Sequence, residues 1–267
     1  MVDSAQTSHF LLASANLLLE TNTFHDRHLT IPQQHERLDA QIESLRGIER
    51  QVGRRAVINI IGLQEVQVIG ERHNGKTIQK ELGYRFGAWQ PHSRVKHGEN
   101  IGVISSVEPD SFEPLELDKN RYAMVLRYDE FCLVVVHQMF SDKNRRRVQF
   151  EALFEYLDGE ECAGVMGDFN EDPIQLGMRT KFGRLGMESA FVRDYKGHPV
   201  TLPAPGYGQY RPWRRRVGFT LLGGGMRYDD IYVTEALKVN RTGTVDSASD
   251  HRFVWADVDR VDKPLVF

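Results

Sequence analysis

The chain has 267 residues, of which 40% are apolar and 27% charged, and its 34 basic and 37 acidic residues give a formal net charge of −3. This is the composition of a soluble globular protein with ample apolar material for a core, and we expect residues 1–267 to form a single domain. This slightly negative net charge argues against a strongly basic protein that coats DNA. It allows a nuclease, because the charges of a basic rim and of an acidic metal site cancel in the net charge.

The N-terminus is a poor match to a secretory signal. Asp3 stands where a signal peptide has basic residues, and the apolar stretch that follows is interrupted by Ser14 and Asn16. No apolar run approaches the length that spans a membrane. We therefore expect a cytoplasmic protein without a membrane association.

Cys132 and Cys162 both lie in apolar runs, FCLVVV and ECAGVM. Two cysteines cannot build a disulfide framework or a four-thiolate zinc site. We expect both to be buried free thiols in strands.

The first third of the chain alternates strand and helix patterns. A first strand ends near Asn16, and Thr30 and Pro32 are helix-start signals ahead of apolar residues at helical spacing over about residues 33–52. The β-branched run at 57–63 is typical of a strand buried on both faces, and it leads into Gln64 and Glu65. A short helix is expected over 69–82.

The remainder is richer in strands. Strand patterns occupy 84–89 and 100–106, and a hairpin is expected with its turn at Asp129 and Glu130. The Gly-, Pro-, Tyr- and Arg-rich segment 195–225 has no clean period and is interpreted as a long functional loop. The other expected elements are hairpin strands at 122–128 and 131–137, a helix containing Phe150, Leu153, Phe154 and Leu157, and strands at 163–166, 229–234 and 253–258.

Polar residues able to do chemistry recur where these strands begin or end. Any one of them is most simply a turn or cap residue, but their joint occurrence favours a site, because strands fix position while their ends face solvent. The residues are Asn16, Glu65, His137, Asp168, Asn170, Asp229, Asp230, Asp250 and His251.

The sequence resembles the endonuclease/exonuclease/phosphatase superfamily, the DNase I-like fold, in the family's order from about Leu11 to Val258. The LQE, GDFN and SDH segments are each moderately specific, and together with a strand-terminal histidine between them they are a strong signal. The matching segments are SAN at 14–16, IIGLQEV at 60–66, NIGVISS at 100–106, NRYAMVLRY at 120–128, LVVVHQMF at 133–140, RRVQF at 146–150, GVMGDFNEDP at 164–173, RYDDIYVT at 227–234 and SASDHRFVWADV at 247–258.

The resemblance implies an α/β (α+β) fold, a four-layer α/β/β/α sandwich of two mixed sheets with helices outside. It also implies a hydrolase of phosphate esters that uses Mg²⁺, with Mn²⁺ as a substitute. Carboxylate and amide oxygens suit such a hard ion. The metal residues implied are Glu65, with Asn16 and Asp250 as helpers.

The resemblance implies a role for each remaining polar residue. His251 would take a proton from the attacking water or position it, and Asp229 would orient that histidine. Asp168 and Asn170 would contact the nucleophile and the phosphate. Two further residues would act on the phosphate: His137, which would bind it or protonate the leaving oxygen, and Arg121, which would contact it.

Some positions depart from the family's patterns. Abasic-site endonucleases have Asp where this chain has Leu18 and Tyr near the position of His137, which argues against that specialised activity. Asp230 follows Asp229 where the family has Tyr, Arg or His. We assign the orienting role to Asp229 because Arg227-x-Asp229 fits the family's R-x-D spacing.

Basic and aromatic residues point to the substrate. The stretch 207–216 contains Arg214, Arg215 and Arg216 among aromatic residues, and we interpret it as a nucleic-acid contact, since arginines meet phosphates and aromatics stack on bases. For Arg145–Arg147 a substrate contact and a solvated charged face are equally good interpretations. We expect a nucleic acid substrate and no obligate protein partner.

Two alternatives stay open. The same arginines could bind a phosphorylated small molecule such as an inositol polyphosphate, which would make the protein a phosphatase. A catalytically inactive family member acting as a binding module is disfavoured, since all the site residues are present. The sequence does not separate DNA from RNA, or endonuclease from exonuclease cleavage.

Overall fold

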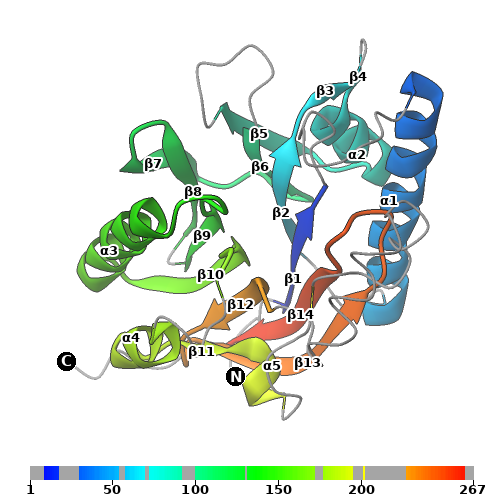
Figure 1. Cartoon of the computed structure of the whole chain (residues 1–267). Coiled ribbons are helices and arrows are strands. Elements are labelled where there is room, and N and C mark those ends of the chain that lie inside the picture. The colour runs from blue at the N-terminus through cyan, green and yellow to red at the C-terminus, as the bar shows by residue number, and fades with distance from the viewer. Residues whose placement is uncertain are drawn as a thin grey trace, which may run out of the picture.

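Two six-stranded mixed sheets stack face to face in a computed structural model that describes residues 9–17, 30–53, 58–69, 72–91, 100–129, 131–171, 177–194, 201 and 227–261 (Figure 1). The first sheet has the order β13 (Leu237–Val245), β14 (Phe253–Arg260), β1 (His9–Asn16), β2 (Ile58–Val66), β6 (Asn100–Ser105), β5 (Phe86–Pro91). The second has the order β11 (Glu188–Ser189), β12 (Asp229–Val233), β10 (Cys162–Asp168), β9 (Phe131–His137), β8 (Arg121–Tyr128), β7 (Ser111–Asp118). A small ribbon pairs β3 (Val68–Ile69) with β4 (Arg72–His73).

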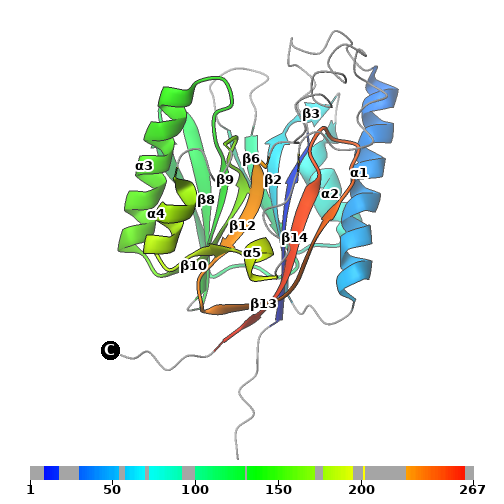
Figure 2. The same ribbon diagram turned by 60° about the horizontal axis from the view of Figure 1, so that its bottom comes forward.

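Helices cover the outer face of each sheet (Figure 2). The first sheet carries α1 (Ile31–Val52) and α2 (Asn74–Leu82), and the second carries α3 (Lys143–Gly159) and α4 (Met178–Arg184), while the short α5 (Ala190–Arg193) follows β11. None of the described helices combines the length and apolar character that crossing a bilayer requires.

Three separate apolar clusters fill the spaces between these layers. One lies between the sheets and includes Leu12 and Val135. A second joins the first sheet to α1 and α2, and a third joins the second sheet to α3 and α4. Three interfaces make four layers, which confirms the expected α/β/β/α sandwich.

The α1 helix shows how the sequence specifies an outer layer. Its start is fixed by Thr30, whose backbone N–H donates to Gln33 Oε1 at 2.9 Å. Leu38, Ile42 and Leu45 recur on one face and are buried against the first sheet. The expected helix over 33–52 is confirmed and begins two residues earlier.

Several expected boundaries were wrong, and β7 and β13 were not expected. The segment expected as a helix over 69–82 spends its first residues in the β3–β4 ribbon, and α2 begins only at Asn74. β7 and β13 are edge strands, so most of their residues are not buried and they lack the apolar alternation that marks a half-buried strand. The hairpin of β8 and β9 is confirmed, with Asp129 in its turn at a positive φ of 45°.

The two cysteines are not free. Cys132 of β9 and Cys162 of β10 lie opposite each other in a parallel pair and form a disulfide, with their Cα atoms 4.4 Å apart. The expectation of free thiols was wrong because 30 residues separate the cysteines in sequence, and only the pairing of β9 with β10 brings them together.

Candidate active site

The second sheet aligns three polar residues side by side at one edge. Asp168 is the last residue of β10 and pairs in register with His137, the last residue of β9. On its other side Asp168 pairs with Asp229, the first residue of the antiparallel β12. All three are at most 2% exposed. Strand register alone therefore brings three of the expected site residues together.

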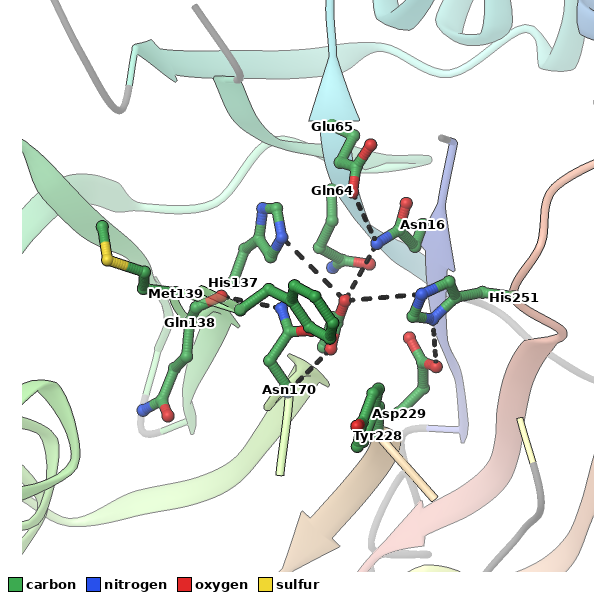
Figure 3. A network of polar contacts seen from close by, with 12 residues as sticks. Asn16, Gln64, Glu65, His137, Gln138, Met139, Asn170, Tyr228, Asp229 and His251 are labelled. Atoms are coloured by element: carbon green, nitrogen blue, oxygen red, sulfur yellow. Dashed lines mark hydrogen bonds and ion pairs between the residues drawn. The ribbon is translucent and has the colours of Figure 1, made fainter. Parts of the chain in front are cut away.

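The first sheet contributes Asn16 and Glu65 from the neighbouring ends of β1 and β2. Asn16 Nδ2 donates to Asp168 Oδ2 at 2.9 Å and to Glu65 Oε1 at 3.3 Å, so one amide joins the two sheets (Figure 3). Glu65 lies in a β-bulge between Leu63 and Val66, where the pairing with β6 shifts register. Its φ of 57° is rare for a non-glycine residue, and such strain concentrates at functional sites.

The end of β10 and the turn that follows it are fixed by close packing and by side-chain hydrogen bonds. Gly167 has a φ of 151°, and a Cβ there would lie 2.0 Å from the carbonyl oxygen of Val136, so only glycine fits. Asp168 Oδ1 accepts from the backbone N–H of Asn170 at 2.8 Å, and Asn170 Nδ2 donates to the Gln138 carbonyl at 2.8 Å. Asn170 is consequently fixed between β9 and β10.

A histidine–aspartate pair lies on the other side of the cluster. His251 Nδ1 donates to Asp229 Oδ2 at 2.7 Å, which leaves Nε2 as the ring nitrogen that points to the centre of the site (Figure 3). The backbone of His251 is held by Ser247 and Ser249. Asp230 accepts from Ser189 Oγ at 2.8 Å instead, so the structure pairs the histidine with the aspartate that the spacing favoured.

Two histidines flank one carboxylate oxygen. Asp168 Oδ2 lies 3.9 Å from His137 Nε2 and 3.9 Å from His251 Nε2, and Figure 3 shows the His137 and His251 rings on different sides of the site. Both separations exceed hydrogen-bond length, so the carboxylate contacts each ring as an ion pair and not as a hydrogen bond.

Burial shapes the electrostatics of this centre. Burial raises the pKa of the Asp168 carboxyl to about 7, with the nearby His251 opposing the shift and Asp229 adding to it. Burial would lower the pKa of His251, but the negative charges of Asp229 and Asp168 outweigh it and raise the pKa well above the usual value.

The implied metal residues lie around the same centre. Asp250 is buried, and its Oδ1 lies 4.0 Å from His251 Nε2. Among the described residues, the group of carboxylate and histidine atoms close enough together to hold a metal ion is a different set, Asp168, Asp229 and His251, with ligand atoms all within 4.8 Å of one another. Within this set His251 Nδ1 and Asp229 Oδ2 already bind each other.

Of the arginines expected to contact phosphate, Arg121 lies among the described residues and the other three do not. Arg121 is buried at the first position of β8. The antiparallel pairing of Met124 with Val135 places the start of β8, and so Arg121, at the same end of the strands as His137. Arg214, Arg215 and Arg216 lie outside the described residues.

Arginines 145–147 all bind carboxylates of the protein. Arg145 Nε donates to Asp118 at 2.6 Å and Arg147 Nε to Glu151 at 3.0 Å. Arg146, which is 8% exposed, makes two bonds to Glu171 Oε2 at 2.8 and 2.9 Å. These contacts favour a structural interpretation of the cluster over a substrate contact.

The Arg146–Glu171 pair fixes the backbone next to the site. Arg146 Nη1 also donates to the carbonyl oxygens of Met139 and Phe140, each at 2.8 Å. It thereby ties the segment after His137 to the segment after Asn170. In the sequence, Arg146 and Gln149 lie at helical spacing on one face of α3 and within the matched segment RRVQF, and these two signals could have pointed to the contact.

Thr201 also escaped the sequence interpretation. It is fully buried, and its Oγ1 accepts from the backbone N–H groups of Tyr228 and Asp229 at 3.1 and 3.2 Å. Its carbonyl accepts from the Arg252 N–H at 2.8 Å. One residue thus fixes the backbone beside both Asp229 and His251, and no period or motif around Thr201 indicates this.

A family model described as the endonuclease/exonuclease/phosphatase family matches residues 13–251. No curated protein matches the chain. Among solved structures, ANGEL2, described as a 2′,3′-cyclic phosphatase in complex with adenosine-2′,3′-vanadate, is 14% identical with a TM-score of 0.65, and the match covers 96% of this chain and 97% of that one.

Two proteins from Bacteroides thetaiotaomicron have the same architecture. The mannosyl-6-phosphatase Bt3783 of strain VPI-5482 is 14% identical with a TM-score of 0.62, covering 93% of this chain and 99% of that one. An endonuclease/exonuclease/phosphatase family protein is 13% identical with a TM-score of 0.63, covering 96% and 99%. At these identities the likenesses confirm the fold alone.

Proposed function

Because this chain belongs to the endonuclease/exonuclease/phosphatase family, whose members are phosphoesterases, we propose that it is a Mg²⁺-dependent phosphodiesterase that cleaves nucleic acid. The observation that carries the proposal is that His137 and His251 each place Nε2 3.9 Å from the same oxygen of Asp168, so two groups able to move protons meet at one buried carboxylate. In-line hydrolysis needs a group at the attacking water and another at the leaving oxygen, on opposite sides of the phosphorus.

His251 acts on the attacking side. In its neutral form, which the raised pKa of His251 makes available at higher pH, Nε2 accepts the proton of the water as the water oxygen bonds to phosphorus. Asp229 holds the ring through Nδ1 and stabilises the imidazolium that forms. Asp168 and Asn170 orient the water and the phosphate from the turn after β10.

His137 acts on the leaving side. As the ester P–O bond breaks, its Nε2 donates a proton to the leaving oxygen, so the products are a phosphate monoester and a free hydroxyl. Arg121, at the same sheet edge, supplies positive charge to the phosphate.

The residues present fit a hard divalent cation. Glu65, Asn16 and Asp250 offer carboxylate and amide oxygens at one edge of the paired sheets, and Mg²⁺ prefers such ligands. When bound, the cation supplies positive charge that neutralises phosphate oxygens. No closed set of cysteine and histidine ligands for zinc exists among the described residues.

Two observations support a nucleic acid substrate. The basic and aromatic stretch 207–216 lies in sequence between segments that reach the site, and it contains Arg214, Arg215 and Arg216. ANGEL2, similar in fold, is described with an adenosine-based ligand. The likeness to a mannosyl-6-phosphatase favours the alternative, a phosphatase of a phosphorylated small molecule.

An activity panel tests the proposal. DNA, RNA, a nucleoside 2′,3′-cyclic phosphate, an inositol polyphosphate and mannose 6-phosphate are incubated with Mg²⁺, with Mn²⁺ and with a chelator. We expect metal-dependent cleavage of a polynucleotide, lost in Glu65→Ala and His251→Ala. Hydrolysis of the sugar or inositol phosphates alone would establish the alternative. No hydrolysis with either metal would favour a binding module.

The basic stretch 207–216 has its own test. Replacing Arg214, Arg215 and Arg216 with Ala should reduce cleavage of a polymer far more than cleavage of a small diester, and should flatten the salt dependence. Equal losses on both substrates would count against a polymer-binding role.

A further inference from the structure

An exposed aromatic ring stands beside the proposed active site. Phe140 is 65% exposed, the highest value among the large apolar side chains that the structure describes as exposed. It lies three residues after His137, and its ring meets that of Tyr228 at a centroid distance of 6.4 Å in an edge-to-face arrangement. Tyr228 directly precedes Asp229, so the aromatic pair joins the two segments that carry site residues.

The backbone beneath this pair is fixed. The Phe140 carbonyl is held by the buried Arg146 at 2.8 Å. Tyr228 donates its N–H to Thr201 Oγ1 and accepts from the N–H of Phe169 at 2.8 Å. An apolar ring that is exposed on a well-anchored backbone contributes little to folding but is ready to contact a ligand at a low cost in conformational entropy.

We propose that Phe140 and Tyr228 form a stacking platform for the nucleobase next to the scissile phosphate. This inference rests on the proposed function and narrows its substrate class to phosphodiesters that carry an aromatic base. A base offers a π-face to the ring whatever its sequence, whereas an inositol or hexose ring offers none, so the platform favours nucleotides without choosing among bases.

The test compares two single-stranded oligonucleotides of equal length and charge, one with bases and one with tetrahydrofuran abasic residues. One stacked base corresponds to about a tenfold effect or more. The parent protein should cleave the base-bearing strand with about tenfold higher kcat/KM. Phe140→Ala should lose that preference, mainly through KM, and should cleave the abasic strand as the parent does.

Matched variants separate stacking from general damage. Phe140→Trp should keep the preference, and Phe140→Leu, apolar but not aromatic, should lose most of it. Phe112→Ala is the control, since Phe112 is also exposed, at 51%, but lies on the edge strand β7. It should leave both substrates unaffected. Equal loss on the two strands in Phe140→Ala would overturn the proposal.

A binding measurement separates this proposal from the proposed function. The fluorescence of Phe140→Trp, corrected for the parent, should be quenched by the base-bearing strand and not by the abasic strand. Absence of quenching overturns the platform, whether or not the protein is active. If the parent hydrolyses only sugar or inositol phosphates in a Glu65-dependent way, the platform and the nucleic acid substrate both fail while the phosphoesterase activity stands.

Discussion

Two histidine–aspartate clusters lie at opposite ends of β1, and they differ in how the two ring nitrogens of the histidine are bound. We call the cluster of His251, Asp229 and Asp168 the open cluster, and the cluster of His9, Asp257 and Asp259 the closed cluster. At the end near Asn16, His251 is bound to Asp229 through Nδ1, while Nε2 lies 3.9 Å from the nearest oxygen of Asp168. At the other end, His9 is closed on both sides. Its Nδ1 contacts Asp259 at 2.5 Å and its Nε2 contacts Asp257 at 2.8 Å.

The same residue types therefore occur in two arrangements, one that we propose is reactive and one that is structural. The Asp257 carboxylate is also bound by Arg241 at 2.9 Å, so its charge is compensated. Around His251 one ring nitrogen is oriented by its hydrogen bond to Asp229, while the carboxylates near the other lie 3.9 and 4.0 Å away, beyond hydrogen-bond length. Only the open arrangement can exchange a proton with a substrate.

Replacing each histidine gives the largest contrast. His251→Ala should lower kcat/KM on the substrate found in the activity panel by about 10²–10⁴-fold, the usual contribution of a general acid or base. His9→Gln should leave kcat/KM within about twofold of the parent, because that cluster touches no reacting atom. Steady-state kinetics on both folded variants measure this, and comparable losses in the two would break the distinction.

Asp229→Asn tests whether orientation of the ring matters. An amide keeps the shape of the side chain but can hold the imidazole in the wrong tautomer, so we expect a loss of about 10²-fold or more in kcat with little change in KM. Asp259→Asn, the matched change at the closed cluster, should leave kcat unchanged. If Asp229→Asn retained parental kcat, His251 would act without help from Asp229.

Thr201 tests how far the backbone beside the open cluster must be fixed for activity. Thr201→Val removes the hydroxyl that accepts two backbone N–H groups, and we expect a loss of about 1–3 kcal/mol in the free energy of unfolding. Because these bonds position Asp229, kcat should fall by about tenfold where the variant is still folded, while Thr201→Ser retains most activity. A Thr201→Val protein with lowered stability but parental kcat would make the residue purely structural.

Changes at the closed cluster should lower the free energy of unfolding and leave activity unchanged. Arg241→Met leaves the buried Asp257 carboxylate with one partner fewer and should cost about 1–3 kcal/mol of unfolding free energy in denaturant titrations. Arg147→Met, which breaks an exposed helical pair with Glu151, should cost less than about 0.5 kcal/mol. Activity should not change in either variant, and equal costs would show that burial of Asp257 is unimportant.

The smallest expected effect is on acid stability. Partial burial alone would raise the pKa of Asp259, but its hydrogen bond with His9, with further help from Lys238, lowers the pKa below the usual 3.8. A lowered carboxyl pKa stabilises the fold above pH 3.8, and this contribution disappears as the pH falls through the folded-state pKa. The Tm difference between parent and Asp259→Asn should therefore be constant above about pH 5 and shrink towards pH 2.5. A constant difference over the whole range would assign the effect to packing.

Much of the fold could be read from the sequence because the elements that pack on both faces carry continuous or periodic apolar patterns. The buried strands β2 and β9 and the helix α1 were expected for this reason. The edge strands β7 and β13 were missed because mostly exposed residues leave no such pattern. The resemblance supplied the stacking of the two sheets, which periodicity alone would not have established.

The sequence by itself determined which residues could do the chemistry, because Asn16, Glu65, Asp168 and His251 stand at the ends of recognisable strands and in family motifs. The tertiary structure decided their contacts. Register places Asp168 between His137 and Asp229, and the stacking of the two sheets brings Asn16 to Asp168 across 152 residues of sequence. Contacts such as the Cys132–Cys162 disulfide and the Thr201 hydrogen bonds join segments whose local patterns are unrelated. Local patterns report only whether a residue is buried, and not which distant residue packs against it.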